Sequence, residues 1–139
     1  MKTYLIDTNA LISFVTDRNM QQQAIISEIF EASAQLKALI LCHQTVLTEF
    51  VYVMDKVYRI PKIRINQMIG DMIVMPGVRV VHEIDLKSLL KLWPESFSDF
   101  AEAVIASVSK GYKGGIVVTF DQKFSKASRS IGAKVIPGP

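Results

Sequence analysis

The chain has 139 residues, of which 50% are hydrophobic, and it carries a formal net charge of +3 with a pI near 9.0. This length predicts a single domain over residues 1–139 with one core. No apolar run approaches the roughly 20 residues that span a bilayer, and no apolar secretory segment precedes the first strand, so we expect a cytoplasmic protein without a membrane partner. The single cysteine, Cys42, excludes an intrachain disulfide and a cysteine-based zinc site.

Apolar strand-like runs alternate with helical patterns along the chain. Short apolar and β-branched runs predict buried strands at 2–6, 38–42, 78–82, 116–120 and 134–136. Apolar residues at helical spacing predict helices near 9–16, 21–36, 44–59, 61–74, 85–93, 97–110 and 121–131. Such alternation is typical of parallel sheets with helices on both faces. We therefore predict a three-layer α/β/α fold with a mostly parallel central sheet of four to five strands.

Two aspartates lie just beyond predicted strands. Asp7 follows Tyr4-Leu5-Ile6, and Asp121 comes shortly after Ile116-Val117-Val118. Ligands of open α/β sheets bind outside the carboxyl ends of the strands, so both carboxylates should lie at one rim. Each aspartate also stands where it can cap the following helix, and taken singly neither differs from a cap. Asn9 is placed to orient Asp7 through its side-chain amide.

Glu49 borders the apolar stripe of the predicted helix 44–59. The stripe consists of Val46, Phe50, Val53, Met54 and Val57. Burying an unpaired carboxylate costs several kcal/mol, so Glu49 requires a cation, a hydrogen-bond donor or a raised pKa. The alternative is that Glu49 lies at the edge of the stripe and reaches water.

Asp99 and Glu102 lie three residues apart and therefore on one helix face. Like charges at this spacing repel unless a cation bridges them. Ser96 offers Asp99 a local explanation, because the two residues form a pair similar to a capping box. Glu102 has no comparable explanation, so it is the better ligand candidate, with Asp99 close behind.

Taken together, the acidic residues favour a metal site over separate structural roles. Carboxylate oxygens gathered at one rim are what Mg²⁺ or Mn²⁺ requires, whereas clustered carboxylates without a cation repel. The predicted ligands are Asp7, Glu49, Asp99, Glu102 and Asp121.

Four short motifs, in this order, carry a resemblance to a known family. They are Ile6-Asp7-Thr8-Asn9, Leu47-Thr48-Glu49-Phe50, the segment 99–106 (Asp-Phe-Ala-Glu-Ala-Val-Ile-Ala) and the segment 118–124 (Val-Thr-Phe-Asp-Gln-Lys-Phe). Their ordered combination resembles the PIN-domain family over essentially the whole chain. Within that family, the chain is similar to the VapC-type ribonuclease toxins of toxin–antitoxin pairs.

The resemblance implies hydrolysis of RNA phosphodiester bonds with Mg²⁺ or Mn²⁺, giving 5′-phosphate and 3′-hydroxyl ends. It carries over to Asp7, Glu49, Asp121 and one acid of the Asp99/Glu102 pair, and it implies a cognate antitoxin. Two polar residues have supporting roles, Asn9 and Thr119. The family often has aspartate where this chain has Glu102, so a weak or inactive PIN module that binds RNA or a partner protein is the open alternative. An aspartyl-phosphate phosphatase would have a second acid where this chain has Asn9. A receiver domain would have paired acids at its first strand and a phosphoacceptor after its third, so neither pattern is met.

Basic and apolar surpluses suggest partners. Beyond residue 110 the basic residues far outnumber the acids, and Lys123, Lys126 and Arg129 are predicted to contact the RNA backbone. A solvated basic surface is the alternative. Further basic candidates are Arg59, Lys62 and Arg64.

The apolar surplus of helices 21–36 and 44–74 predicts a homodimer interface or a groove for an antitoxin helix. This surplus consists of Ile25, Ile26, Ile29, Phe30, Ile65, Met68, Ile69, Met72 and Ile73.

Overall fold

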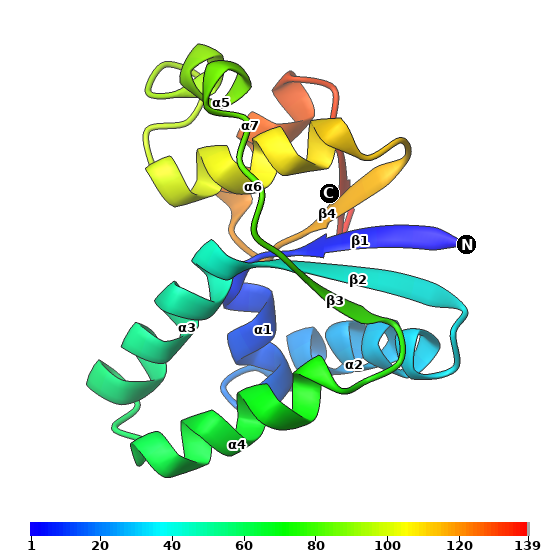
Figure 1. The fold of residues 1–139 in the computed structure, drawn as a ribbon, viewed down its shortest axis with the longest axis vertical. Helices are drawn as coiled ribbons and strands as arrows, with labels where there is room; N and C mark the ends of the chain where they lie inside the picture. The colour runs from blue at the N-terminus through cyan, green and yellow to red at the C-terminus, as the bar shows by residue number, and fades with distance from the viewer. Residues whose placement is uncertain (139) are drawn as a thin grey trace.

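The computed structural model describes residues 1–138 and contains a five-stranded sheet between two helical layers (Figure 1). The strands are β1 (Lys2–Ile6), β2 (Ala38–His43), β3 (Val78–Val81), β4 (Gly115–Val118) and β5 (Lys134–Ile136). They are ordered β3-β2-β1-β4-β5, and every neighbouring pair is parallel. The predicted sheet is therefore confirmed, with all of its strands parallel.

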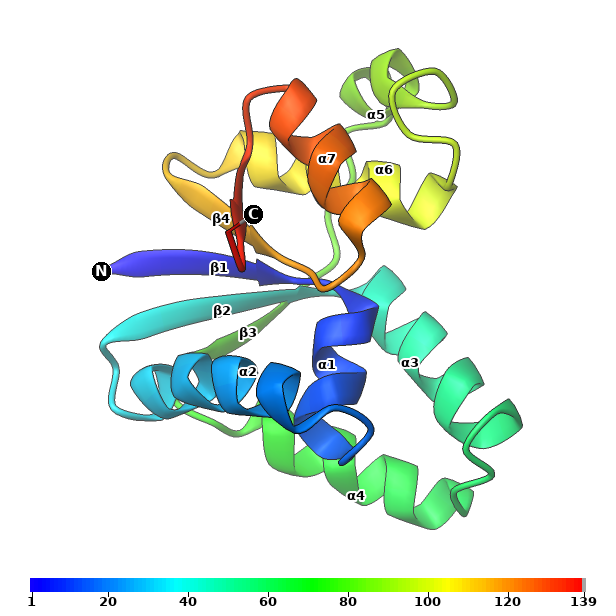
Figure 2. The same cartoon turned by 180° about the vertical axis from the view of Figure 1, so that it is seen from behind.

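The helices divide between the two faces of the sheet in chain order. The first group consists of α1 (Thr8–Val15), α2 (Met20–Ala34), α3 (Gln44–Lys56) and α4 (Lys62–Ile73). The second group consists of α5 (Leu86–Leu92), α6 (Phe100–Gly111) and α7 (Gln122–Ser130). Opposite views show the first group on one face and the second on the other (Figures 1 and 2). This arrangement confirms the three-layer fold. Within residues 1–138, no helix is both long enough and apolar enough to cross a bilayer.

The core lies on both faces of the central strand. Leu5 pairs in register with Leu41 of β2 and Val117 of β4, and its side chain is buried on the opposite face from that of Ile6. Because β1 is flanked by β2 and β4, its carboxyl end lies between theirs. Residues that follow these three strands are thereby brought to one place.

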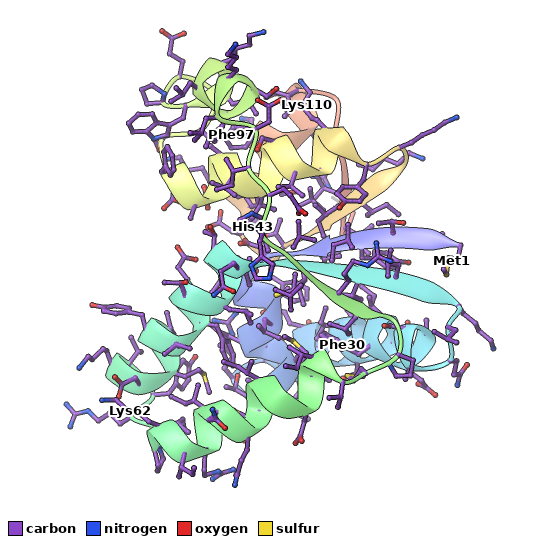
Figure 3. The ribbon with its side chains drawn as sticks, viewed as in Figure 1. Met1, Phe30, His43, Lys62, Phe97 and Lys110 are labelled. Atoms are coloured by element: carbon purple, nitrogen blue, oxygen red, sulfur yellow. The ribbon has the colours of Figure 1, made fainter. Side chains whose placement is uncertain are left out.

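Aromatic pairs fix the helical layers. Phe30 of α2 stacks on Phe14 of α1 with ring centroids 3.8 Å apart, and Figure 3 labels Phe30 in the helical layer formed by α1 to α4. On the other face, Phe97 packs edge-on against Phe124 of α7 at 5.7 Å. Burying each ring contributes about 1.5–3 kcal/mol to stability.

Two predicted helix limits are wrong, one because of a tertiary contact and one because of the backbone conformation. The predicted helix 97–110 begins at Phe100, with Asp99 as its N-cap, because Phe97 is drawn into the core ahead of the helix. Ser96 therefore does not take part in a capping box. The predicted helix 44–59 ends at Lys56, shortly before Arg59 adopts a φ of 55°, a left-handed conformation that helices cannot continue through.

Most of the apolar surplus predicted to form an interface belongs to the core. Ile26, Ile29, Phe30, Ile65 and Met72 are buried. Among the predicted residues only Ile25 and Ile73 are exposed. Other large apolar side chains are exposed on α3 and α4 and at the turn after α3: Val51, Tyr52, Val57 and Ile63.

Candidate active site

The predicted acids lie around one rim of the sheet. Asp7 directly follows β1, Asp121 closely follows β4, and Glu49 lies on α3, which begins where β2 ends. Figure 2 shows the starts of α1, α3 and α7 together at the carboxyl edge of the sheet. Glu102 joins them from the first turn of α6.

Asp7 is the buried centre of this rim, with 4% of its surface exposed. Its Oδ1 accepts the backbone N–H of Thr8 at 2.8 Å, which caps α1. Its Oδ2 accepts the Thr119 hydroxyl at 2.8 Å and the Asn9 amide at 3.2 Å. Burial, together with the charges of Glu49 and Asp121, raises the pKa of Asp7 to about 6, although the hydrogen bonds from Thr119 and Thr8 lower it. One residue thus serves as both the cap and the centre of the acidic cluster.

Thr119 and Asn9 form the support beneath Asp7. The Thr119 hydroxyl has one proton, which it gives to Asp7, and it accepts the Asn9 amide and the backbone N–H of Asp121, both at 3.1 Å. Asn9 Oδ1 in turn accepts the backbone N–H of Phe120 at 2.9 Å. The network holds the Asp7 side chain through Asn9 on α1 and Thr119 just after β4.

Glu49 is half-buried and hydrogen-bonded. Its Oε2 accepts the hydroxyl of Thr8 at 2.6 Å. This partner answers the burial problem posed by the sequence. Thr8 itself was missed, although it lies between Asp7 and Asn9, because no local pattern indicates a bond to a residue 41 positions away.

Glu102 is half-buried, and the other acids surround it. Burial, together with the charges of Asp7, Asp99, Asp121 and Glu49, raises the pKa of its carboxyl to about 7. All five acids therefore share one electrostatic neighbourhood. Of the Asp99/Glu102 pair, Glu102 is the acid that lies half-buried among the others, whereas Asp99 is exposed.

Asp99 and Asp121 are exposed and both cap helices. Asp99 Oδ1 accepts the backbone N–H of Glu102 at 3.0 Å, and Asp121 Oδ1 accepts that of Phe124 at 2.9 Å. The capping alternative is therefore correct for Asp121, whereas Asp99 caps α6 itself and does not pair with Ser96. Capping leaves one carboxylate oxygen of each for another role.

The donor chemistry of this rim fits Mg²⁺ or Mn²⁺. The candidate ligand atoms are carboxylate oxygens, which hard divalent cations prefer, and the pKa values of Asp7 and Glu102 are raised by burial and, in smaller part, by neighbouring carboxylate charges that a cation would offset. Within residues 1–138, however, no three His, Cys, Asp or Glu side chains are already arranged to hold an ion. Binding would require the carboxylates around Asp7 to turn inward.

The predicted RNA-binding residues separate into two groups. Lys126 and Arg129 line a hollow of about 590 Å³ that includes Thr119 and Asp121, whereas Lys123 is exposed outside it. Arg129 is partly structural, since its guanidinium donates to the carbonyls of Val135 and Pro137 at 3.4 and 3.1 Å.

The basic candidates at the α3–α4 junction lie elsewhere. Figure 3 labels Lys62 at the outer end of these helices, far from His43 at the carboxyl end of β2. His43 is structural. Its Nδ1 accepts the N–H of Thr45 at 3.1 Å to cap α3, and its Nε2 faces the Glu83 carbonyl at 3.1 Å.

Comparison with known proteins identifies the family. The family model described as PIN domain matches residues 4–130. The chain belongs to the PIN-domain family. This PIN protein is similar to VapBC2 from Rickettsia felis, solved with a DNA fragment from its promoter, at 14% identity over 96% of each chain with a TM-score of 0.67.

Two further solved structures resemble this PIN protein. VapC20 from Mycobacterium tuberculosis, a sarcin-ricin loop cleaving toxin, has 16% identity over 89% of this chain and 94% of that one, with a TM-score of 0.65. PAE2754 from Pyrobaculum aerophilum has 19% identity over 97% and 91%, also with a TM-score of 0.65. At these identities the likeness establishes the fold. No curated protein sequence matches the chain significantly.

Proposed function

We propose that this PIN protein is an endoribonuclease that depends on Mg²⁺ or Mn²⁺. The observation that carries the proposal is the buried Asp7 carboxylate, fixed by Thr119 and Asn9 and surrounded by further acids whose charges raise its pKa. A buried carboxylate among other acids lowers the stability of the fold, so stability does not explain it. Perturbed carboxylates at a sheet rim mark functional sites. The similarity to a toxin that cleaves an RNA loop supports RNA as the substrate.

Four acids would hold the ion: Asp7, Glu49, Glu102 and Asp121. When bound, the ion supplies an activated water and neutralises charge that develops on the phosphate. Thr119 and Asn9 hold the Asp7 carboxylate in one rotamer, and Thr8 does the same for Glu49. Asp99 serves mainly to start α6, because the charge of Asp121 raises the pKa of Asp7 whereas that of Asp99 does not.

We further infer that the protein is the toxin of a VapBC-type pair and a homodimer. Two observations support this: the similarity to the VapBC2 complex and the exposed apolar side chains Val51, Tyr52, Val57 and Ile63 around α3 and the start of α4. Light scattering of the purified protein at micromolar concentration tests the dimer, and a strictly monomeric particle would refute it. A small protein encoded next to this gene, whose co-expression relieves growth arrest, is the expected antitoxin.

Cleavage of a mixed pool of structured RNA tests the activity. We expect the purified protein to cleave RNA with Mg²⁺ or Mn²⁺, and to lose cleavage in EDTA. Asp7→Asn, checked for folding by circular dichroism, should be inactive as well. Full activity of that variant would refute the proposed site. RNA binding that a chelator does not diminish, with no cleavage in any lane, would instead favour a binding module.

A further inference from the structure

Arg18 is a cation held beside the acidic rim without a carboxylate partner. It lies between α1 and α2, where its Nη2 donates to the Asn9 carbonyl at 2.7 Å and its Nε donates to the Ser13 hydroxyl at 2.9 Å. Among residues 1–138, the one ion pair within 4.0 Å joins Lys56 and Asp55. The acceptors of Arg18 are neutral, and no carboxylate among the described residues lies within 4.0 Å of its guanidinium nitrogens.

The Arg18 side chain is held in place by a buried hydrogen-bond relay. Ser13 has no exposed surface, accepts from Arg18 and donates to Gln22 Oε1 at 2.8 Å. A guanidinium has five N–H groups, and Ser13 and Asn9 each take one. The rest stay free in a fixed orientation. An exposed arginine that only keeps a surface wet needs no such buried partner.

Arg18 borders an open hollow next to the candidate active site. The hollow, of about 350 Å³, is lined by Asn9, Arg18, Asn19, Gln22, Phe120 and Asp121. Asn9 and Asp121 belong to the acidic rim. Arg18 therefore stands directly beside the proposed point of cleavage.

This hollow continues into the larger one between α2 and α7. The two hollows share Asn19, Gln22, Phe120 and Asp121, and the larger one reaches Lys126 and Arg129. Together they form a polar groove, with Arg18 at one end and the two α7 cations at the other. A single-stranded polyanion can lie along such a groove with successive phosphates at its cations.

We propose that Arg18 binds a backbone phosphate of the RNA strand adjacent to the phosphate that is cleaved. This proposal rests on the ribonuclease activity proposed above. A planar guanidinium presents parallel N–H donors that match two phosphate oxygens, and its fixed orientation lowers the entropy lost on binding. Arg18 is a positioning residue, since it holds the strand while the acids carry the reaction.

RNA binding in an inactive background tests this role. A fluorescent single-stranded RNA is titrated with Asp7→Asn protein and with the same protein carrying Arg18→Gln, Arg18→Lys or Arg79→Gln. Arg79 is the matched control, because it is an exposed arginine on β3 at the opposite edge from β4 and β5.

We expect Arg18→Gln to weaken RNA binding about tenfold and to lower the slope of log K against log salt by about 0.7, the value for one phosphate contact on a single strand. Arg18→Lys should keep the salt slope but recover only part of the affinity. Arg79→Gln should leave both unchanged. Equal weakening by Arg18→Gln and Arg79→Gln would show that only overall charge matters and would overturn the inference.

Turnover separates this inference from the proposed activity. In the otherwise unchanged protein, Arg18→Gln should raise KM for RNA about tenfold with a smaller change in kcat. If the unchanged protein cleaves RNA and Arg18→Gln has the same KM, the role of Arg18 is wrong and the nuclease stands. If the unchanged protein neither cleaves nor binds RNA, both proposals fail.

Discussion

The hydroxyl of Thr8 donates a 2.6 Å hydrogen bond to Oε2 of Glu49, which joins the first turn of α1 to the middle of α3. Asn9, the next residue, donates to Asp7. The tripeptide Asp7-Thr8-Asn9 therefore contributes one acid and the side chains that orient two. A short strand-to-helix junction sets the geometry of both sides of the candidate site.

Thr8→Val should impair the site without unfolding the protein. Valine keeps the shape of threonine but cannot donate to Glu49, so we expect metal-dependent cleavage to fall about 10–100-fold, the usual range for partners of metal ligands. Thr48→Val is the control, since Thr48 is exposed on the same helix as Glu49 and its hydroxyl donates to the Gln44 carbonyl. Equal activities of the two variants in a cleavage assay would contradict the role of Thr8.

Asp7→Asn should stabilise the metal-free protein at neutral pH and above. The pKa of Asp7 rises from 3.8 to about 6 on folding, so its contribution to stability is complete below about pH 4 and is lost as the pH rises through 6. Asparagine stays uncharged at every pH. The variant should therefore exceed the native protein by at most about 3 kcal/mol near pH 8 and by little near pH 4.

Urea unfolding in EDTA at both pH values measures this difference. Asp17→Asn, an exposed substitution after α1, should show no such dependence. An Asp7→Asn protein that is less stable at pH 8 would mean that the hydrogen bonds to the carboxylate outweigh its desolvation.

Mg²⁺ or Mn²⁺ should raise the unfolding temperature by several degrees. An ion that binds only the folded chain stabilises it by about 2.7 kcal/mol at one hundred times its dissociation constant. Carboxylates must be ionised to bind, so the affinity should increase as the pH rises through about 6 to 7, where Asp7 and Glu102 lose their protons. Scanning calorimetry with and without EDTA tests both expectations. An unfolding temperature that no divalent ion shifts would argue against the metal site.

Glu102→Gln and Asp99→Asn should separate the roles of the two neighbouring acids. Glu102 is half-buried among the acids, so its neutral replacement should lower cleavage at least about 100-fold and abolish the metal-induced stabilisation. Asp99 caps α6, and asparagine caps equally well, so Asp99→Asn should stay within a few-fold of the native activity. The reverse ranking of activities would assign the metal to Asp99.

The elements of the fold could be predicted because their signals are local. The strand 2–6 could be predicted from the apolar run Tyr4-Leu5-Ile6, and its limits agree with β1 (Lys2–Ile6). The start of α6 could not be predicted in the same way. Phe97 continues the helical pattern in sequence, but its contact with Phe124 from α7 places it in the core ahead of the helix.

The candidate site divides along the same line. The acidic residues could be picked out as candidates because each belongs to a short motif in the sequence. Thr8 and Arg18 could not, because their roles depend on contacts with Glu49 and Ser13 that only the folded chain creates. The sequence also could not separate helix capping from metal binding at Asp121. Its Oδ1 caps α7, and its second carboxylate oxygen stays available for an ion.

The position of Thr119 ties the candidate active site to the final third of the chain. Asp7 is synthesised early, but the hydroxyl that fixes it arrives only with β4, more than a hundred residues later. A nascent chain that has not yet added β4 beside β1 lacks both this hydroxyl and Asp121. The fold thereby delays assembly of the acidic cluster until β4 is in place, and a truncated product that ends before β4 would lack the proposed site.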